Sequence, residues 1–376
     1  MTHRRIFGAV LVIFGAWMSF YRPAVHAQGA QGPMPPKPGI TVQKAPDDAI
    51  RVKVALVNAP VAVSDDKGEL ILDLQQKDFH VLDNGVEQTI ESFDLGAEPL
   101  SAVLLFETSS RITPLMPAVQ KSAIIFTQTV VGPSGEAAVL GYNDATDKLL
   151  PFTGDRDKIE KSIANLKIGS SGTRLYNALS EAVQMLKDRP ADRRRVVILV
   201  GEARDAGSEV RLGEVLREAQ LSNVVIYTVG LSSTAAALRS QDPQKYPPSA
   251  TPPGTFGMPP VPGTAQTPTS QQQQYGTANV DLLAAAEWAV QHTKEIVKNR
   301  PLEVATVATG GLYQSAFRDR TIENAVDAIG GELNAQYTLS YHPTDSDAPG
   351  YHKIKVTVDR AGAKVRTRPG YVLTAN

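Results

Sequence analysis

The sequence has no cysteine among its 376 residues. This absence excludes disulfide bonds, thiolate metal sites, a cysteine nucleophile and a lipid-bearing cysteine. An excess of charge of one sign is also missing, because 38 lysines and arginines stand against 39 aspartates and glutamates. No overall field would draw the chain to nucleic acid or to an anionic membrane. Recognition of a partner must therefore depend on local sites.

Sequence motifs for catalysis are missing as well. No G-x-S-x-G elbow, P-loop or H-E-x-x-H zinc motif occurs. The histidines after residue 27 are scattered among predicted strands and a helix, at His80, His292, His342 and His352. Single histidines in such places are far more often surface or satisfied core residues than general bases. The sequence therefore favours a protein that is not an enzyme, and a hydrolase ranks well below the other classes.

A long apolar run occurs only near the N-terminus. Arg4 and Arg5 precede an apolar run at residues 6–20, and Val25-His26-Ala27 follows it. This order is typical of a secretory signal peptide, here residues 1–27. The alternative is an uncleaved anchor, but the run is shorter than the roughly 20 residues that span a bilayer. We expect an exported protein, periplasmic or extracellular, with no membrane span after cleavage.

Strand-like segments lie on both sides of the middle of the chain. A leader rich in proline and glycine, residues 28–48, is expected to be disordered. Residues 49–98 then alternate apolar and polar side chains in short runs, with Asn84-Gly85 placed to form the turn of a hairpin. Residues 335–376 contain three more strand-like runs. We expect these two segments to pair into one small β domain.

Between them, residues 99–334 alternate strand and helix patterns. Apolar runs of strand length, such as SAVLLFE at 101–107 and RVVILV at 195–200, are typical of a sheet covered on both faces. We predict a doubly wound, mostly parallel α/β sheet flanked by helices. Residues 241–278, rich in proline and glutamine, are expected to be a disordered insertion. The predicted helices are 114–130, 155–166, 174–188, 209–221, 281–298 and 319–333, and the further strands are 137–142, 146–152, 223–229 and 311–316.

Polar side chains collect in four loops at 107–113, 143–147, 169–173 and 201–208. In an open α/β sheet, ligands gather at the carboxyl ends of the strands. Carboxylates and hydroxyls are the oxygen ligands that Mg²⁺ or Ca²⁺ requires. The candidate ligand-binding face comprises Glu107, Ser109, Ser110, Arg111, Asp144, Thr173, Glu202 and Asp205.

The chain resembles von Willebrand factor A domain proteins, in particular a bacterial, largely acidobacterial, group of exported proteins with a related A domain. The resemblance includes KDFHVLDNGVEQTIESF before the α/β segment, and YTLSYHP, YHKIKVTV and VRTRPGY after it. It covers nearly all of the chain after the signal. It implies a von Willebrand A-like fold and an extracytoplasmic protein-binding module for adhesion or assembly.

The family's A domain usually carries a metal-ion-dependent adhesion site. An Asp-x-Ser-x-Ser loop, a distant threonine and a later Asp-Gly hold a cation that captures an acidic group of the ligand. By resemblance, the metal ligands here would be Glu107, Ser109, Thr173 and Glu202, with Mg²⁺ as the ion. The partner would be an unidentified protein, bound through an acidic side chain.

Three positions depart from that motif. Glu107 and Glu202 replace aspartates, and each extra methylene displaces the oxygens in a site where Mg²⁺ tolerates little error. Arg111 replaces the second serine and brings a permanent positive charge. Metal binding thus remains one reading. The favoured alternative is that Arg111 bridges the two glutamates and stands in for the ion, and the domain could then also be a structural scaffold of the cell envelope without metal-dependent capture.

We predict that the precursor is cleaved between Ala27 and Gln28, because a short apolar run is followed by a Val-x-Ala site. Intact-mass analysis of the protein recovered from the extracytoplasmic fraction checks this. A mass that retains residues 1–27 would contradict it.

Overall fold

The computed structural model describes residues 56–96, 98–190, 192–233, 282–293, 300–344 and 349–373. The expected signal peptide (1–27), the leader (28–48) and the insertion (241–278) lie outside these ranges. Within the ranges, no helix combines the length and the apolar character needed to cross a bilayer.

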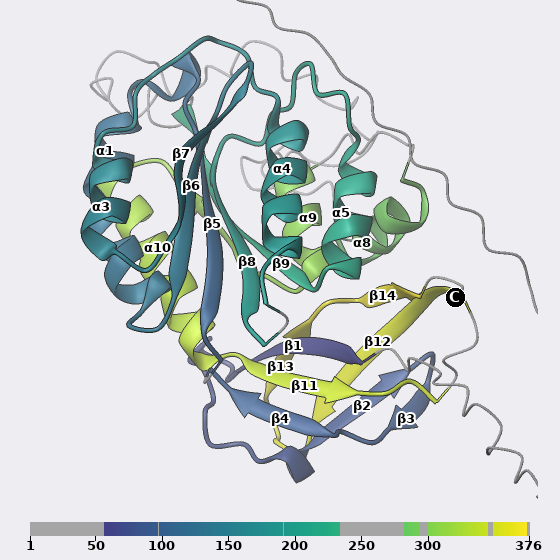
Figure 1. The fold of residues 1–376 in the computed structure, drawn as a ribbon. Helices are drawn as coiled ribbons and strands as arrows, with labels where there is room; N and C mark the ends of the chain where they lie inside the picture. The colour runs from purple at the N-terminus through teal and green to yellow at the C-terminus, as the bar shows by residue number, and fades with distance from the viewer. Residues whose placement is uncertain are drawn as a thin grey trace, which may run out of the picture. The chain divides into compact units, whose positions relative to one another are not determined.

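The α/β part is built on a six-stranded sheet in the order β10-β9-β8-β5-β6-β7 (Figure 1). The strands are β5 (Leu100–Glu107), β6 (Glu136–Tyr142), β7 (Thr146–Thr153), β8 (Arg194–Gly201), β9 (Val224–Leu231) and β10 (Tyr313–Ala316). All neighbours are parallel except β6 and β7. Every residue of β5 is buried, as its continuous apolar run predicts for a strand covered on both faces. The predicted doubly wound, mostly parallel sheet is confirmed.

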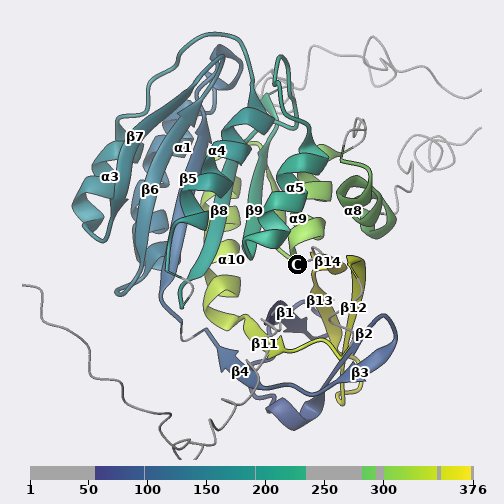
Figure 2. The same ribbon diagram turned by 45° about the vertical axis from the view of Figure 1, so that its right-hand side comes forward.

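Helices cover both faces of this sheet, as Figures 1 and 2 show. One face packs against α1 (Met116–Lys121), α2 (Ala123–Ile125), the π-helical turn η3 (Phe126–Val131), α3 (Arg156–Ala164) and α10 (Asp319–Ala335). The other face packs against α4 (Leu175–Lys187), α5 (Leu212–Leu221), α8 (Leu282–Gln291) and α9 (Pro301–Thr309). Because side chains alternate along a strand, β5 supplies Leu104 to the first core and Leu105 to the second.

Two helices differ from the sequence prediction. The segment predicted as one helix at 114–130 is divided into α1, α2 and η3. Helix α9 was not predicted, because its valines and threonines have the composition of a strand. Its threonine hydroxyls bond back to carbonyls one turn earlier, Thr306 to Leu302 at 2.7 Å and Thr309 to Ala305 at 3.0 Å. This bonding satisfies their polar groups within a buried helix.

The N- and C-terminal strands pair as predicted, but they form two sheets. One sheet has the order β13-β1-β11-β4 and the other β14-β12-β2-β3. The strands are β1 (Val57–Ser64), β2 (Phe79–Asp83), β3 (Val86–Gln88), β4 (Ser92–Leu95), β11 (Tyr337–Tyr341), β12 (Gly350–Val358), β13 (Lys364–Thr367) and β14 (Gly370–Leu373). Asn84 and Gly85 have φ angles of 48° and 86°, which is the positive-φ pair that a type I′ hairpin needs.

The β domain adjoins the amino ends of the parallel strands. Strand β4 ends at Leu95, five residues before β5 begins at Leu100. Arg366 of β13 fixes this junction, because it bonds to the carbonyls of Gly310 and Gly311 and to the buried carboxylate of Glu332 on α10. The carboxyl ends of β5, β6, β8 and β9 therefore lie at the end of the sheet that points away from the β domain (Figure 1).

Candidate functional site

The candidate site begins at the last residue of the central strand, Glu107, which is 1% exposed. One of its carboxylate oxygens accepts a short hydrogen bond from the Ser109 hydroxyl. The other accepts the backbone N–H of Glu202 at 2.6 Å, across from the end of β8. The Glu107 carboxylate thus joins the loops that follow β5 and β8.

The close approach of these two strand ends requires a glycine at position 201. A Cβ atom there would lie 2.2 Å from the Tyr142 hydroxyl and 3.1 Å from the Glu107 carboxylate. Only a residue without a side chain lets the Glu202 N–H reach Glu107.

Arg111 forms a salt bridge with Glu202, one of the two glutamates that it was predicted to bridge. Its Nε donates to Glu202 Oε2 at 3.0 Å, and its backbone N–H donates to the Ser109 hydroxyl at 3.3 Å. Arg111 is 36% exposed and Glu202 10% exposed in their side chains. The predicted guanidinium clamp therefore forms with Glu202, and Glu107 reaches the clamp through Ser109 and the Glu202 backbone.

Ser233 is a participant that the sequence reasoning missed. Its backbone N–H donates to Glu202 Oε1 at 3.0 Å, and its hydroxyl donates to the same oxygen. Ser233 follows the end of β9, so the strand-end rule that selected the other loops could have found it. With Arg111 on one oxygen and Ser233 on the other, both oxygens of the Glu202 carboxylate accept hydrogen bonds.

The pKa values of Glu107 and Glu202 are shifted in opposite directions. Burial raises the pKa of Glu107, and the hydrogen bonds from Ser109 and from the Glu202 N–H offset only part of that effect. Burial also acts to raise the pKa of Glu202, but the bonds from Ser233 and Arg111 outweigh it and leave this pKa below its ordinary value. The hydrogen bonds and the charge around Glu202 therefore favour its ionised form.

The other predicted residues lie around this centre in loops that are tied together. Ser110 is exposed, and its backbone N–H donates to the Ser170 carbonyl at 2.9 Å. The exposed Asp144 packs its carboxylate against the α-carbon of Gly172. One oxygen of Asp205 accepts the Tyr176 N–H at 3.1 Å at the start of α4 and the Ser208 hydroxyl at 2.5 Å.

Thr173 is 1% exposed, and its carbonyl accepts the Ala206 N–H at 2.8 Å. Among the residues described by the structure, its hydroxyl oxygen has no hydrogen-bond partner. Thr173 thus links two of the loops through its backbone, while its hydroxyl takes no part in the network around Glu107.

The residues present do not fit a divalent cation. The guanidinium of Arg111 bonds to one oxygen of Glu202 and places a positive charge there, and Ser233 donates to the other oxygen. Mg²⁺ needs several free oxygens in octahedral geometry. In the described part of the chain, no three histidine or acidic side chains cluster in a way that could hold a metal ion.

A hollow of about 690 Å³ lies beside the site. Thr108, directly after Glu107, lines it together with Asn143 and Gly169. Three lysines also line it, namely Lys158, Lys161 and Lys167, with Asp147 as a single carboxylate. The hollow therefore has a net positive lining.

Comparisons with known proteins place the middle of the chain in a family. Residues 103–203 match the sequence profile described as the von Willebrand factor type A domain. Among solved structures, the chain is similar to BatB from Bacteroides thetaiotaomicron (13% identity, 62% of this chain and 98% of that one, TM-score 0.38). It is also similar to a von Willebrand factor type A protein from Catenulispora acidiphila (10% identity, 80% and 75%, TM-score 0.43). Among curated proteins, none matches.

Replacing Arg111 by serine is expected to raise the affinity for Mg²⁺ and Mn²⁺ by about tenfold or more, because it removes a positive charge 3.0 Å from Glu202. Adding Glu107→Asp and Glu202→Asp should raise it further by restoring shorter ligands. Calorimetric titration measures both, with Arg217→Ser on exposed α5 surface as the control. Tight Mg²⁺ binding by the wild type, abolished by Glu107→Ala, would show that the site works as a metal site despite Arg111.

Proposed function

Because residues 103–203 match the profile of the von Willebrand factor type A domain, we propose that this protein is a binding module that captures an acidic protein partner without a divalent cation. Domains of this type generally act as protein-interaction modules. The contact surface in this proposal is formed by the loops at the carboxyl ends of the parallel strands. The observation that carries it is the partly exposed Arg111 guanidinium, anchored on Glu202.

Arg111 has donors left over for a partner. A guanidinium has five N–H groups in one plane. Only the Nε of Arg111 donates to Glu202, and the two terminal nitrogens have no hydrogen-bond partner among the residues described. With its side chain 36% exposed, Arg111 can offer these two nitrogens to a carboxylate in the bidentate geometry that arginine favours.

The anchored position of Arg111 makes this capture stronger than that of a free surface arginine. An exposed ion pair loses much of its attraction to the entropy of two mobile side chains. The bonds of Arg111 to Glu202 and of Glu202 to Ser233 fix the guanidinium before the partner arrives. Such preorganisation lowers the ordering cost of binding.

The neighbouring hollow supports the same class of partner. Lys158, Lys161 and Lys167 line it, and Lys158 is already paired with Asp155 at 3.0 Å. The other two lysines leave a positive surface beside Arg111. A partner segment with several acidic side chains would be attracted electrostatically to Arg111 and to the lysine-lined hollow before it binds, and it would contact both once bound.

The proposal includes two further statements about the biology of the chain. The protein is not an enzyme in this proposal, because the Ser109 and Ser233 hydroxyls are already hydrogen-bonded to Glu107 and Glu202. It acts outside the cytoplasm, as the signal-like residues 1–27 indicate. The degenerate adhesion site then serves adhesion or assembly at the cell envelope.

We expect a photo-cross-linking residue at the exposed Ala203 to capture a partner in cell-envelope extract in the presence of EDTA. The Arg111→Gln substitution should reduce the yield by about tenfold, because it removes the anchored guanidinium. A cross-linker at the exposed Asp188, after α4, is the matched control, and mass spectrometry identifies the captured segment.

Capture that requires Mg²⁺, or that is equal at positions 203 and 188, would rule out cation-independent binding at this face. Loss of capture at both positions would favour a scaffold role instead.

A further inference from the structure

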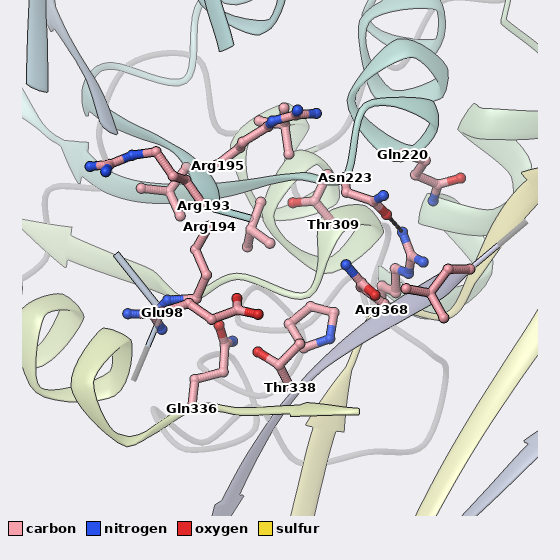
Figure 3. A pocket seen from close by; sticks show the side chains of 16 residues that line it. Glu98, Arg193, Arg194, Arg195, Gln220, Asn223, Thr309, Gln336, Thr338 and Arg368 are labelled. Carbon is pink, nitrogen blue, oxygen red and sulfur yellow. Dashed lines mark hydrogen bonds between the residues drawn. The ribbon is translucent and has the colours of Figure 1, made fainter. Parts of the chain in front are cut away.

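A second cavity, of about 280 Å³, lies at the amino ends of the parallel strands, where the α/β part meets the β domain. Glu98, Arg194, Gln220 and Asn223 line it from the α/β side. Gln336 and Arg368 line it from the C-terminal side (Figure 3). Its volume is close to the lower end of the range for ligand pockets, roughly 300 to 1,000 Å³.

Arg368 is the main charge in this cavity, and it is 4% exposed. Across the described ranges, no carboxylate pairs with it, and its Nε has no hydrogen-bond partner. Its one hydrogen bond to a side chain, from a terminal nitrogen to Asn223 Oδ1, is long at 3.5 Å. The Tyr371 ring, 5.7 Å away, gives it a further weak contact. A buried guanidinium without a counter-ion is costly, and burial lowers the pKa of Arg368 accordingly.

The opposite end of the cavity holds more unsatisfied donors. Arg194 bonds the Leu333 carbonyl at 2.6 Å through one terminal nitrogen, but its buried Nε has no partner among the residues described. The buried Gln336 amide nitrogen also has no hydrogen-bond partner among the residues described. Figure 3 shows these two side chains near Glu98, across the cavity from Arg368 and Asn223.

The remaining arginines of the lining donate to groups that are not part of it, although the Nε of Arg195 has no partner among the residues described. Arg193 donates to the Ser101 hydroxyl at 2.8 Å, and Arg195 donates to the Ser222 carbonyl at 3.0 Å. Figure 3 shows both guanidinium groups directed away from the space between Glu98 and Arg368. Among the side chains that face this space, the unsatisfied donors are therefore those of Arg368, Arg194 and Gln336.

We propose that this cavity binds a small organic anion, with its carboxylate or phosphate group on Arg368. The anion supplies the counter-charge that Arg368 lacks and accepts a hydrogen bond from its unsatisfied Nε. The far end of the ligand carries an oxygen acceptor for Arg194 and Gln336. Glu98 is the one carboxylate of the lining, and it disfavours a second full negative charge at that end. The site is separate from the Arg111 face, and it does not depend on the proposed function.

The test uses the full chain and two probes, succinamate (the monoamide of succinate, with one carboxylate and one amide) and inorganic phosphate, with sodium chloride at matched ionic strength. We expect a saturable rise in the melting temperature, confirmed by calorimetry, with at least one probe. Succinamide, the neutral analogue, should produce no rise. A response to succinamate alone identifies a carboxylate site, and a response to phosphate alone identifies a phosphate site.

Two substitutions make the test specific. Arg368→Gln should weaken binding by about tenfold or more, because it removes the charge that pairs with the anion. Arg360→Gln is the control, because Arg360 is an exposed arginine paired with Asp73 at 2.9 Å. Asn223→Asp is a second test that remains decisive if the Arg368→Gln variant fails to fold. It places a carboxylate beside Arg368 at a positive-φ position (φ 51°) that aspartate tolerates.

The Asn223→Asp variant should melt at a higher temperature than the wild type and should no longer respond to the anion, because it carries its own counter-ion. Absence of saturable binding of either probe to the wild type would overturn the proposal. Wild-type affinity in a folded Asn223→Asp variant would do the same.

Discussion

A carboxylate buried at the end of the central strand must be compensated, and the strand-end face is organised around that requirement at Glu107. Burial of an ionised group costs far more than any single contact returns, unless hydrogen bonds and charges replace the lost water. The Ser109 hydroxyl and the Glu202 N–H supply that replacement. The second bond in turn fixes the end of β8, demands glycine at position 201 and positions the Glu202 side chain beside Arg111.

In our proposal, the arrangement at Glu202 takes the place of a bound cation. Two carboxylates without a counter-charge would have a formal charge of −2, which a dication could neutralise. Arg111 reduces the formal charge to −1 and occupies one Glu202 oxygen, while Ser233 occupies the other. The same guanidinium still presents free donors at the surface. In our proposal, one arginine thus performs two tasks of a bound ion, which are to hold the loops together and to attract an acidic group.

Much of the fold was predictable because its signals are local. The apolar run that ends at Glu107 identifies a strand buried on both faces, and Asn84-Gly85 identifies a hairpin. The salt bridge of Arg111 followed from charge and from the rule that strand ends converge. Helix α9 was missed because Thr306 and Thr309 satisfy their hydroxyls inside a buried helix, which composition does not reveal. Arg368, in the stretch VRTRPGY, could not be singled out from the sequence, because its lack of a counter-ion depends on residues far away in the sequence.

The central claim is that the pairing of Arg111 with Glu202 replaces a cation, and a double-mutant cycle tests it most directly. The free energy of unfolding would be measured for the wild type, Arg111→Gln, Glu202→Gln and the double variant, each in EDTA and in millimolar Mg²⁺. We predict a coupling free energy of about 1–2 kcal/mol in EDTA that Mg²⁺ leaves unchanged. A coupling of zero in EDTA, together with stabilisation of the wild type by Mg²⁺, would contradict the claim.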